Sequence, residues 1–144
     1  MNLVIDASVL IKAYVPEILS DKAEEVMARV ADGELLLLAP DLLYPETGSI
    51  LWKKHRLHEL TRGEVDEIVD AISALPIKIE ASRTVMPLAF AIAIHSGITV
   101  YDAMSVTVAR IYETKLITAD RKLVERLATT EFSKYVKRLE TGIG

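Results

Sequence analysis

The chain contains no cysteine and no glutamine, and Asn2 is its single asparagine. Without cysteine there can be no disulfide, no thiolate nucleophile and no zinc–sulfur centre, and a reducing compartment such as the cytoplasm is favoured. Cysteine, asparagine and glutamine are the heat-labile residues, so we hypothesise from their scarcity that the source is thermophilic. A melting temperature in the ordinary mesophilic range would contradict that hypothesis.

Long apolar runs and an excess of positive charge are also missing. No run approaches the ~20 residues of a membrane span, and the start has no basic segment followed by a cleavage site. We therefore expect a cytoplasmic protein without a membrane partner. The net charge of −4 does not by itself indicate nucleic-acid binding, which usually goes with a basic surface. Basic residues do cluster at 53–56, 121–126 and 134–138, where either solvated helix faces or a nucleic-acid contact would explain them.

Length and patterning predict one domain over residues 1–144. Hydrophobic residues make up 51% and charged residues 26%, as in globular proteins. Short β-rich runs alternate with helical patterns, which is typical of α/β architecture. We predict a parallel sheet of about five strands flanked by helices, an α/β/α sandwich. The expected strands cover 2–6, 35–38, 77–79, 115–118 and an edge strand at 135–139.

The helical patterns alternate with these strands. Thr61 and Glu64 match a capping box, which predicts a helix start at Thr61. Residues 84–96 are apolar nearly all round, so we expect that helix to be buried. The expected helices cover 8–14, Ser20 (as cap) to Gly33, 42–56, Thr61 to Pro76, 84–96, 102–113 and 121–128.

Four acids stand where the expected strands end. Asp6 closes the first strand, Glu46 follows the second, Asp102 follows an apolar run at 98–101, and Asp120 follows 115–118. The carboxyl ends of parallel strands open onto one crevice. Four carboxylates meeting there would repel one another unless a cation joined them, and oxygen ligands suit Mg²⁺ or Mn²⁺. This combination points to metal-assisted hydrolysis of a phosphodiester.

Each acid also has a structural explanation. Asp6, Asp102 and Asp120 precede expected helices, where an Asp makes a good N-cap and meets the positive end of the helix dipole. Glu46 lies too far inside its helix to be a cap. Leu43 and other apolar residues share its face, and an acid buried there needs a cation. Because no basic partner is evident from the pattern, Glu46 discriminates best between the two explanations.

Two hydroxyls accompany the acids. Ser8 comes two residues after Asp6, and Thr118 two residues before Asp120. Either hydroxyl could bind a metal's water or orient a carboxylate. A helix-cap role for Ser8 and a plain strand position for Thr118 explain them equally well.

Four segments in order resemble one known family. They are Val4 to Leu10, Pro40 to Glu46, Tyr101 to Ala103 and Leu116 to Leu123, and together they are similar to PIN-domain ribonucleases, most closely to the VapC toxins of toxin–antitoxin pairs. The resemblance covers nearly the whole chain. Ser49 stands where many relatives have Asn, and Ser105 where many have a bulkier residue, which affects substrate preference more than catalysis.

The resemblance implies a PIN-like fold and an endoribonuclease that depends on Mg²⁺ or Mn²⁺. It implies a homodimer, an RNA substrate and a small antitoxin protein that blocks the cleft. Asp6, Glu46, Asp102 and Asp120 inherit the catalytic and metal-binding roles. Asp6, Asp102 and Asp120 would hold the metal, and Glu46 would complete its shell or act as base. Ser8 and Thr118 match the accessory positions.

Other interpretations remain open at this stage. A phosphotransfer domain of the receiver type also gathers acids at strand ends, although it usually begins with paired acids and Asp6 stands alone. A non-catalytic binding module with a decayed site is a further alternative. A third keeps the PIN-type nuclease but gives it a role in RNA maturation or quality control.

Overall fold

A parallel sheet of five strands forms the centre of the molecule in the computed structural model, which describes residues 1–143. The strand order is β3-β2-β1-β4-β5. The predicted fold class is therefore confirmed, and so is the edge position of the last strand. The strands are β1 Asn2–Ile5, β2 Leu36–Pro40, β3 Ile77–Glu80, β4 Leu116–Thr118 and β5 Val136–Arg138.

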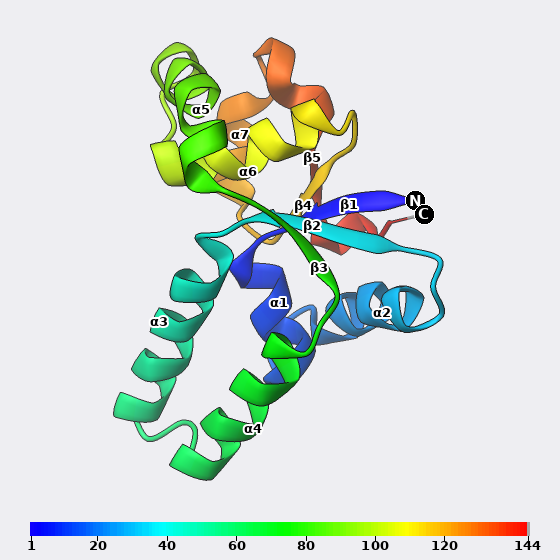
Figure 1. Cartoon of the computed structure of the whole chain (residues 1–144), viewed down its shortest axis with the longest axis vertical. Helices are drawn as coiled ribbons and strands as arrows, with labels where there is room; N and C mark the ends of the chain where they lie inside the picture. The colour runs from blue at the N-terminus through cyan, green and yellow to red at the C-terminus, as the bar shows by residue number, and fades with distance from the viewer. Residues whose placement is uncertain (144) are drawn as a thin grey trace.

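Helices cover both faces of this sheet (Figure 1). Side chains of a strand point alternately to opposite faces, so Val4 contributes to one core and Ile5 to the other. Helices α1–α4 lie on the Ile5 side and α5–α7 on the Val4 side. The helices are α1 Ala7–Tyr14, α2 Ser20–Ala31, α3 Leu43–Arg56, α4 Arg62–Ser73, α5 Ser82–Ser96, α6 Val100–Ile111 and α7 Arg121–Leu127, with 3₁₀ turns η1 Glu131–Tyr135 and η2 Leu139–Thr141.

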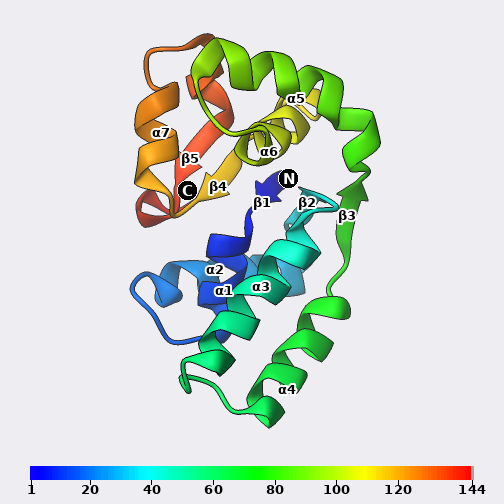
Figure 2. The same cartoon turned by 90° about the vertical axis from the view of Figure 1, so that its left-hand side faces the viewer.

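Helices α3 and α4 form a hairpin that projects from the sheet (Figure 2). The predicted capping box starts α4: Glu64 N donates to Thr61 Oγ1 at 3.1 Å, and Thr61 N donates to Glu64 Oε1 at 2.9 Å. Leu60 and Val65 pack in one small cluster with the buried Leu51 of α3. Local signals in the sequence thus start α4 and hold it against α3.

Two helix starts differ from the sequence prediction. Ser20 is the first residue of α2 rather than its cap, because its hydroxyl serves the preceding loop by accepting from Glu17 N at 2.8 Å. The apolar run at 98–101 is not a strand. Thr99 is the N-cap of α6 and accepts from Asp102 N at 3.1 Å. Packing of α6 against α5 and the sheet overrides the β-propensity of this run.

The expectation that 84–96 forms a buried helix is also wrong. Only one face of α5 is buried, the face that carries Val85, Ala89 and Ile92. Met86, Phe90 and Ile94 follow one another at helical spacing beside this buried face and are 53%, 56% and 70% exposed. The helix therefore presents an apolar stripe to solvent.

The strand order bears on the receiver alternative and on where a site can form. Receiver domains have the order 2-1-3-4-5, so the observed order contradicts that alternative. Here the chain turns from one side of the sheet to the other between β1 and β4, and the crevice at such a reversal is the usual ligand site of open α/β sheets.

Within residues 1–143 no helix alone is long and apolar enough to cross a membrane; α5 and α6 pass that test only as a pair bent by 113°.

Candidate active site

All four predicted acids line one pocket of about 180 Å³ at the carboxyl ends of β1 and β4. Only Asp6 and Asp120 come within two residues after a strand. Glu46 lies in the first turn of α3, and Asp102 in the first turn of α6. The helices, rather than four strand ends, therefore bring the acids together.

Asp6 sits between β1 and α1 and is held by three groups. Its Oδ1 accepts from Ser8 Oγ at 2.5 Å and from Val9 N at 3.1 Å, and Thr118 also bonds to its side chain. Burial raises the pKa of this carboxyl above its usual range. The three hydrogen bonds oppose that rise, and the charge of Asp102 adds to it. Asp6 is thus a helix cap and an acid of the pocket at once.

Taken as a whole, the Glu46 residue is exposed to solvent, so the expectation of a buried side chain is wrong. Its carboxyl nevertheless faces the other acids in the pocket. Desolvation in the pocket, followed by the charges of Asp6 and Asp102, raises its pKa from 4.5 to about 7. No described Lys, Arg or His lies within ion-pair distance of Glu46.

Asp102 does not cap α6, because Thr99 does so. Desolvation raises the pKa of Asp102, and the charge of Asp120 raises it further, while the Thr99 hydrogen bond and Arg126 oppose the shift. Since the cap fixes the first turn of α6, it also fixes the backbone from which Asp102 reaches the pocket.

Asp120 is the N-cap of α7 and lies exposed at the rim. Its Oδ1 accepts from Leu123 N at 3.2 Å, and its own N–H donates to Thr118 Oγ1 at 3.1 Å. The cap explanation is confirmed for Asp6 and Asp120. It does not compete with a site role, because the same carboxylates line the pocket.

The two accessory hydroxyls connect β4 to the start of α1. Ser8 Oγ donates to Asp6 and accepts from Ala119 N at 3.3 Å, while the buried Thr118 bonds to Asp6 and to Asp120 N. Neither is a helix cap. Both set the position of Asp6 relative to Asp120.

The donor set is chemically suited to a hard divalent cation. Four carboxylates share one pocket, three have raised pKa values, and none forms an ion pair with a described basic side chain. Within residues 1–143, however, no three His, Asp or Glu side chains are arranged so that they could hold one ion as they stand. The observation that fits a cation is the crowding of four negatively charged carboxylates, because a cation would offset their mutual repulsion.

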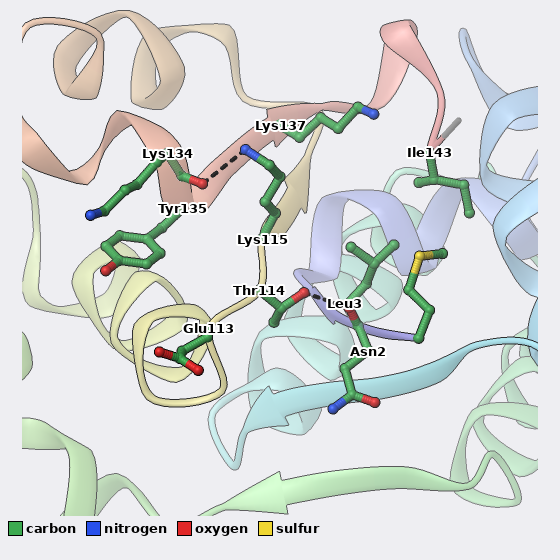
Figure 3. A pocket seen from close by; sticks show the side chains of 10 residues that line it. Asn2, Leu3, Glu113, Thr114, Lys115, Lys134, Tyr135, Lys137 and Ile143 are labelled. Atoms are coloured by element: carbon green, nitrogen blue, oxygen red, sulfur yellow. Dashed lines mark hydrogen bonds between the residues drawn. The ribbon is translucent and has the colours of Figure 1, made fainter.

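A larger hollow of about 560 Å³ lies at the other end of the strands (Figure 3). The start of β1, Glu113, Thr114 and Tyr135 line it together with Lys115, Lys134 and Lys137. The amine of Lys115 donates to the carbonyl of Lys134 at 2.8 Å. None of the four acids reaches this hollow, so its size does not make it the reactive site.

Comparison with known proteins identifies the family. The family model for the PIN domain matches residues 3–128. The chain belongs to the PIN domain family. Ribonuclease VapC3 of Pyrobaculum aerophilum is 34% identical over 128 residues, which cover 88% of this chain and 95% of that protein.

Solved structures share the PIN fold along nearly the whole chain. A crystal structure from Pyrobaculum aerophilum has a TM-score of 0.69 at 23% identity, covering 98% of this chain and 85% of that one. A toxin–antitoxin complex from Klebsiella pneumoniae has a TM-score of 0.63 at 13% identity. The match covers 95% of this chain and 97% of that one. VapBC2 from Rickettsia felis, bound to a promoter DNA fragment, has a TM-score of 0.65 at 10% identity. The match covers 96% of this chain and 98% of that one.

Proposed function

We propose that this PIN-domain protein is an endoribonuclease that depends on Mg²⁺ or Mn²⁺ and cleaves RNA phosphodiester bonds. The observation that carries the proposal is the convergence of Asp6, Glu46, Asp102 and Asp120 in one pocket, where no basic side chain of residues 1–143 forms an ion pair with them. The similarity to a protein named as a ribonuclease supports it.

The four acids would be the ligands of the metal. When bound, the metal lowers the pKa of a water and offsets charge on the leaving oxygen. Ser8 and Thr118 hold Asp6 in position through their hydroxyls. Glu46 completes the ligand set or accepts a proton from the attacking water.

Cleavage of a panel of single-stranded RNAs with Mg²⁺ or Mn²⁺ tests this activity. Wild type is compared with Asp6→Asn and Glu46→Gln, and with Arg29→Met, which removes a surface charge paired to Glu34 at 3.2 Å. We expect metal-dependent cutting by wild type and Arg29→Met, and its loss in both acid variants. Cutting that survives in both acid variants would contradict the assignment.

We further propose that the protein is the toxin of a toxin–antitoxin pair and acts in the cytoplasm, with a small antitoxin protein as partner. Two of the structures that match it along nearly their whole length are toxin–antitoxin assemblies. Induced expression in a bacterial host should arrest growth, and Asp6→Asn should relieve the arrest. Normal growth with active enzyme present would favour a role in RNA maturation or quality control instead.

A homodimer is proposed on the exposed stripe of α5. Met86, Phe90 and Ile94 form an apolar line that can pair with the same line of a second copy about a two-fold axis. Light scattering after gel filtration should show a dimer for wild type and a monomer for Phe90→Lys. Val69→Lys, at a 43% exposed position of α4, is the matched control and should remain dimeric. A dimeric Phe90→Lys variant would place the interface elsewhere.

A further inference from the structure

A second pocket of about 330 Å³ adjoins the acidic one. Ser8, Ile50 and Asp120 line both pockets, so these residues form a wall between neighbouring hollows. Lys12 from α1 and Lys54 from α3 line only the second pocket. Nucleic-acid strands are held mainly through their phosphates by such basic side chains, and a pocket of acids by itself repels them.

Glu17, in the connection between α1 and α2, joins these two lysines. Lys12 Nζ lies 3.2 Å from Glu17 Oε2, and Lys54 Nζ lies 2.6 Å from Glu17 Oε1. Side-chain exposure is only 16% for Lys12 and 19% for Lys54. Both ammonium groups are therefore held in place beside the acids. Because folding has already restricted the two lysine side chains, binding a phosphate costs little further conformational entropy.

The carboxylate of Glu17 shows that the two lysines together bind an anionic group with two oxygens. Desolvation would raise its pKa, but hydrogen bonds and charge from Lys54 and Lys12 outweigh that effect and lower it. The hydrogen bond to Glu17 raises the pKa of Lys54. Two cations thus already share one anionic group whose oxygens are spaced like two oxygens of a phosphate.

We propose that Lys12 and Lys54 form a phosphate subsite for the RNA strand, next to the phosphate that is cut, and that Glu17 occupies it until RNA arrives. This subsite rests on the proposed ribonuclease function. Its two lysines bind substrate, and Glu17 is an internal anion that the backbone phosphate displaces. The competing explanation is a structural ion pair that ties α1, the loop and α3 together.

The experiment measures binding and cleavage in the full-length protein. A labelled single-stranded RNA is titrated by fluorescence anisotropy with Ca²⁺ in place of Mg²⁺, and initial rates are measured with Mg²⁺. Lys12→Met and Lys54→Met should each raise Kd and KM about three- to tenfold, leave kcat within about twofold, and reduce the salt slope by about 0.7. Glu17→Gln removes the anion that both lysines share and leaves Lys54 only its longer contact with Glu59 at 3.7 Å, so its Kd should fall.

The sign of the Glu17→Gln effect separates the two explanations. A structural ion pair predicts that all three variants lower the melting temperature alike and leave Kd unchanged, which would overturn the subsite. Lys115→Met is the matched control, because it removes one lysine from the opposite hollow (Figure 3). An equal loss of affinity in that variant would mean diffuse charge and also overturn the proposal.

Failure of the subsite is distinguishable from failure of the proposed function. If wild type cuts RNA while the lysine variants bind and cut like wild type, only the subsite is wrong. If wild type neither binds nor cuts any RNA, the ribonuclease assignment fails and the subsite fails with it.

Discussion

The hydroxyl of Ser8 donates to the same Asp6 oxygen that accepts the backbone N–H of Val9, at 2.5 and 3.1 Å. One oxygen of the carboxylate is thereby committed to the start of α1. The hydroxyl turns toward Asp6 while its own oxygen accepts from Ala119 N. Ser8 thus sets the orientation in which Asp6 meets the pocket.

Ser8→Ala should leave the helix cap intact and weaken metal binding. Losing this hydrogen bond raises the pKa of Asp6 further and frees its rotation, and loss of an orienting partner typically costs 10–100-fold in metal affinity. Calorimetric titration with Mn²⁺ at constant pH measures the effect. Ser133→Ala, at an exposed position of η1, is the control. Equal Mn²⁺ affinity in wild type and Ser8→Ala would contradict the role.

Without metal, the protein should lose stability as pH rises from about 4.5 to about 7. The pKa of Glu46 is raised from 4.5 to about 7, so the folded state holds a proton there that the unfolded state has released. Its stabilising contribution is full below the unfolded pKa and disappears as pH passes the folded one. Melting temperatures in EDTA should fall less for Glu46→Gln than for wild type across this window.

Saturating Mn²⁺ should restore the wild-type melting temperature at pH 7, because the cation replaces the lost protons. Equal pH dependence in wild type and Glu46→Gln would show that Glu46 does not titrate as described. An unchanged melting temperature on adding Mn²⁺ would count against the metal site itself.

Thr99→Ala and Thr61→Ala form a matched pair. Each threonine caps a helix and accepts from the N–H three residues on at 3.1 Å. Each substitution should lower the free energy of unfolding by about 1 kcal/mol. Because Asp102 sits in the turn that Thr99 fixes, only Thr99→Ala should also weaken Mn²⁺ binding. Chemical denaturation and calorimetry measure the two effects, and equal Mn²⁺ affinities would uncouple the cap from the site.

Asp120→Asn separates the two roles of Asp120. Asparagine caps a helix as well as aspartate, so the free energy of unfolding should stay within about 0.5 kcal/mol of wild type. Loss of the carboxylate should lower Mn²⁺ affinity if Asp120 is a ligand, and that is the outcome we expect. Wild-type affinity in Asp120→Asn would leave Asp120 as a cap alone.

The sequence alone predicts the sheet, the two helices α3 and α4 and the four acids, because these depend on local signals. Strand periodicity, the capping box at Thr61 and the acids after apolar runs are all readable within a few residues. The start of α6 is not, since the run at 98–101 has strand propensity and becomes helical only through packing. The exposed stripe of α5 is missed because all-round apolarity does not tell a buried helix from one that exposes an apolar side.

The pairing of Glu17 with two lysines could not be predicted either. Lys12, Glu17 and Lys54 lie on different elements, and no spacing in the sequence relates Lys54 to the other two. Such a cluster follows from how α1 and α3 are placed on the sheet. The hydroxyl roles of Ser8 and Thr118 were open for the same reason, because both depend on the pairing of β1 with β4.

The order of the strands also decides when the acidic pocket is complete. Asp6 waits at the end of β1 while the ribosome adds more than a hundred residues, since the last acid, Asp120, follows β4. Before β4 pairs with β1, a nascent chain already has Asp6, Glu46 and Asp102 but lacks Asp120 and the strand that places it against Asp6. The proposed ribonuclease activity therefore has to wait until β4 is in place.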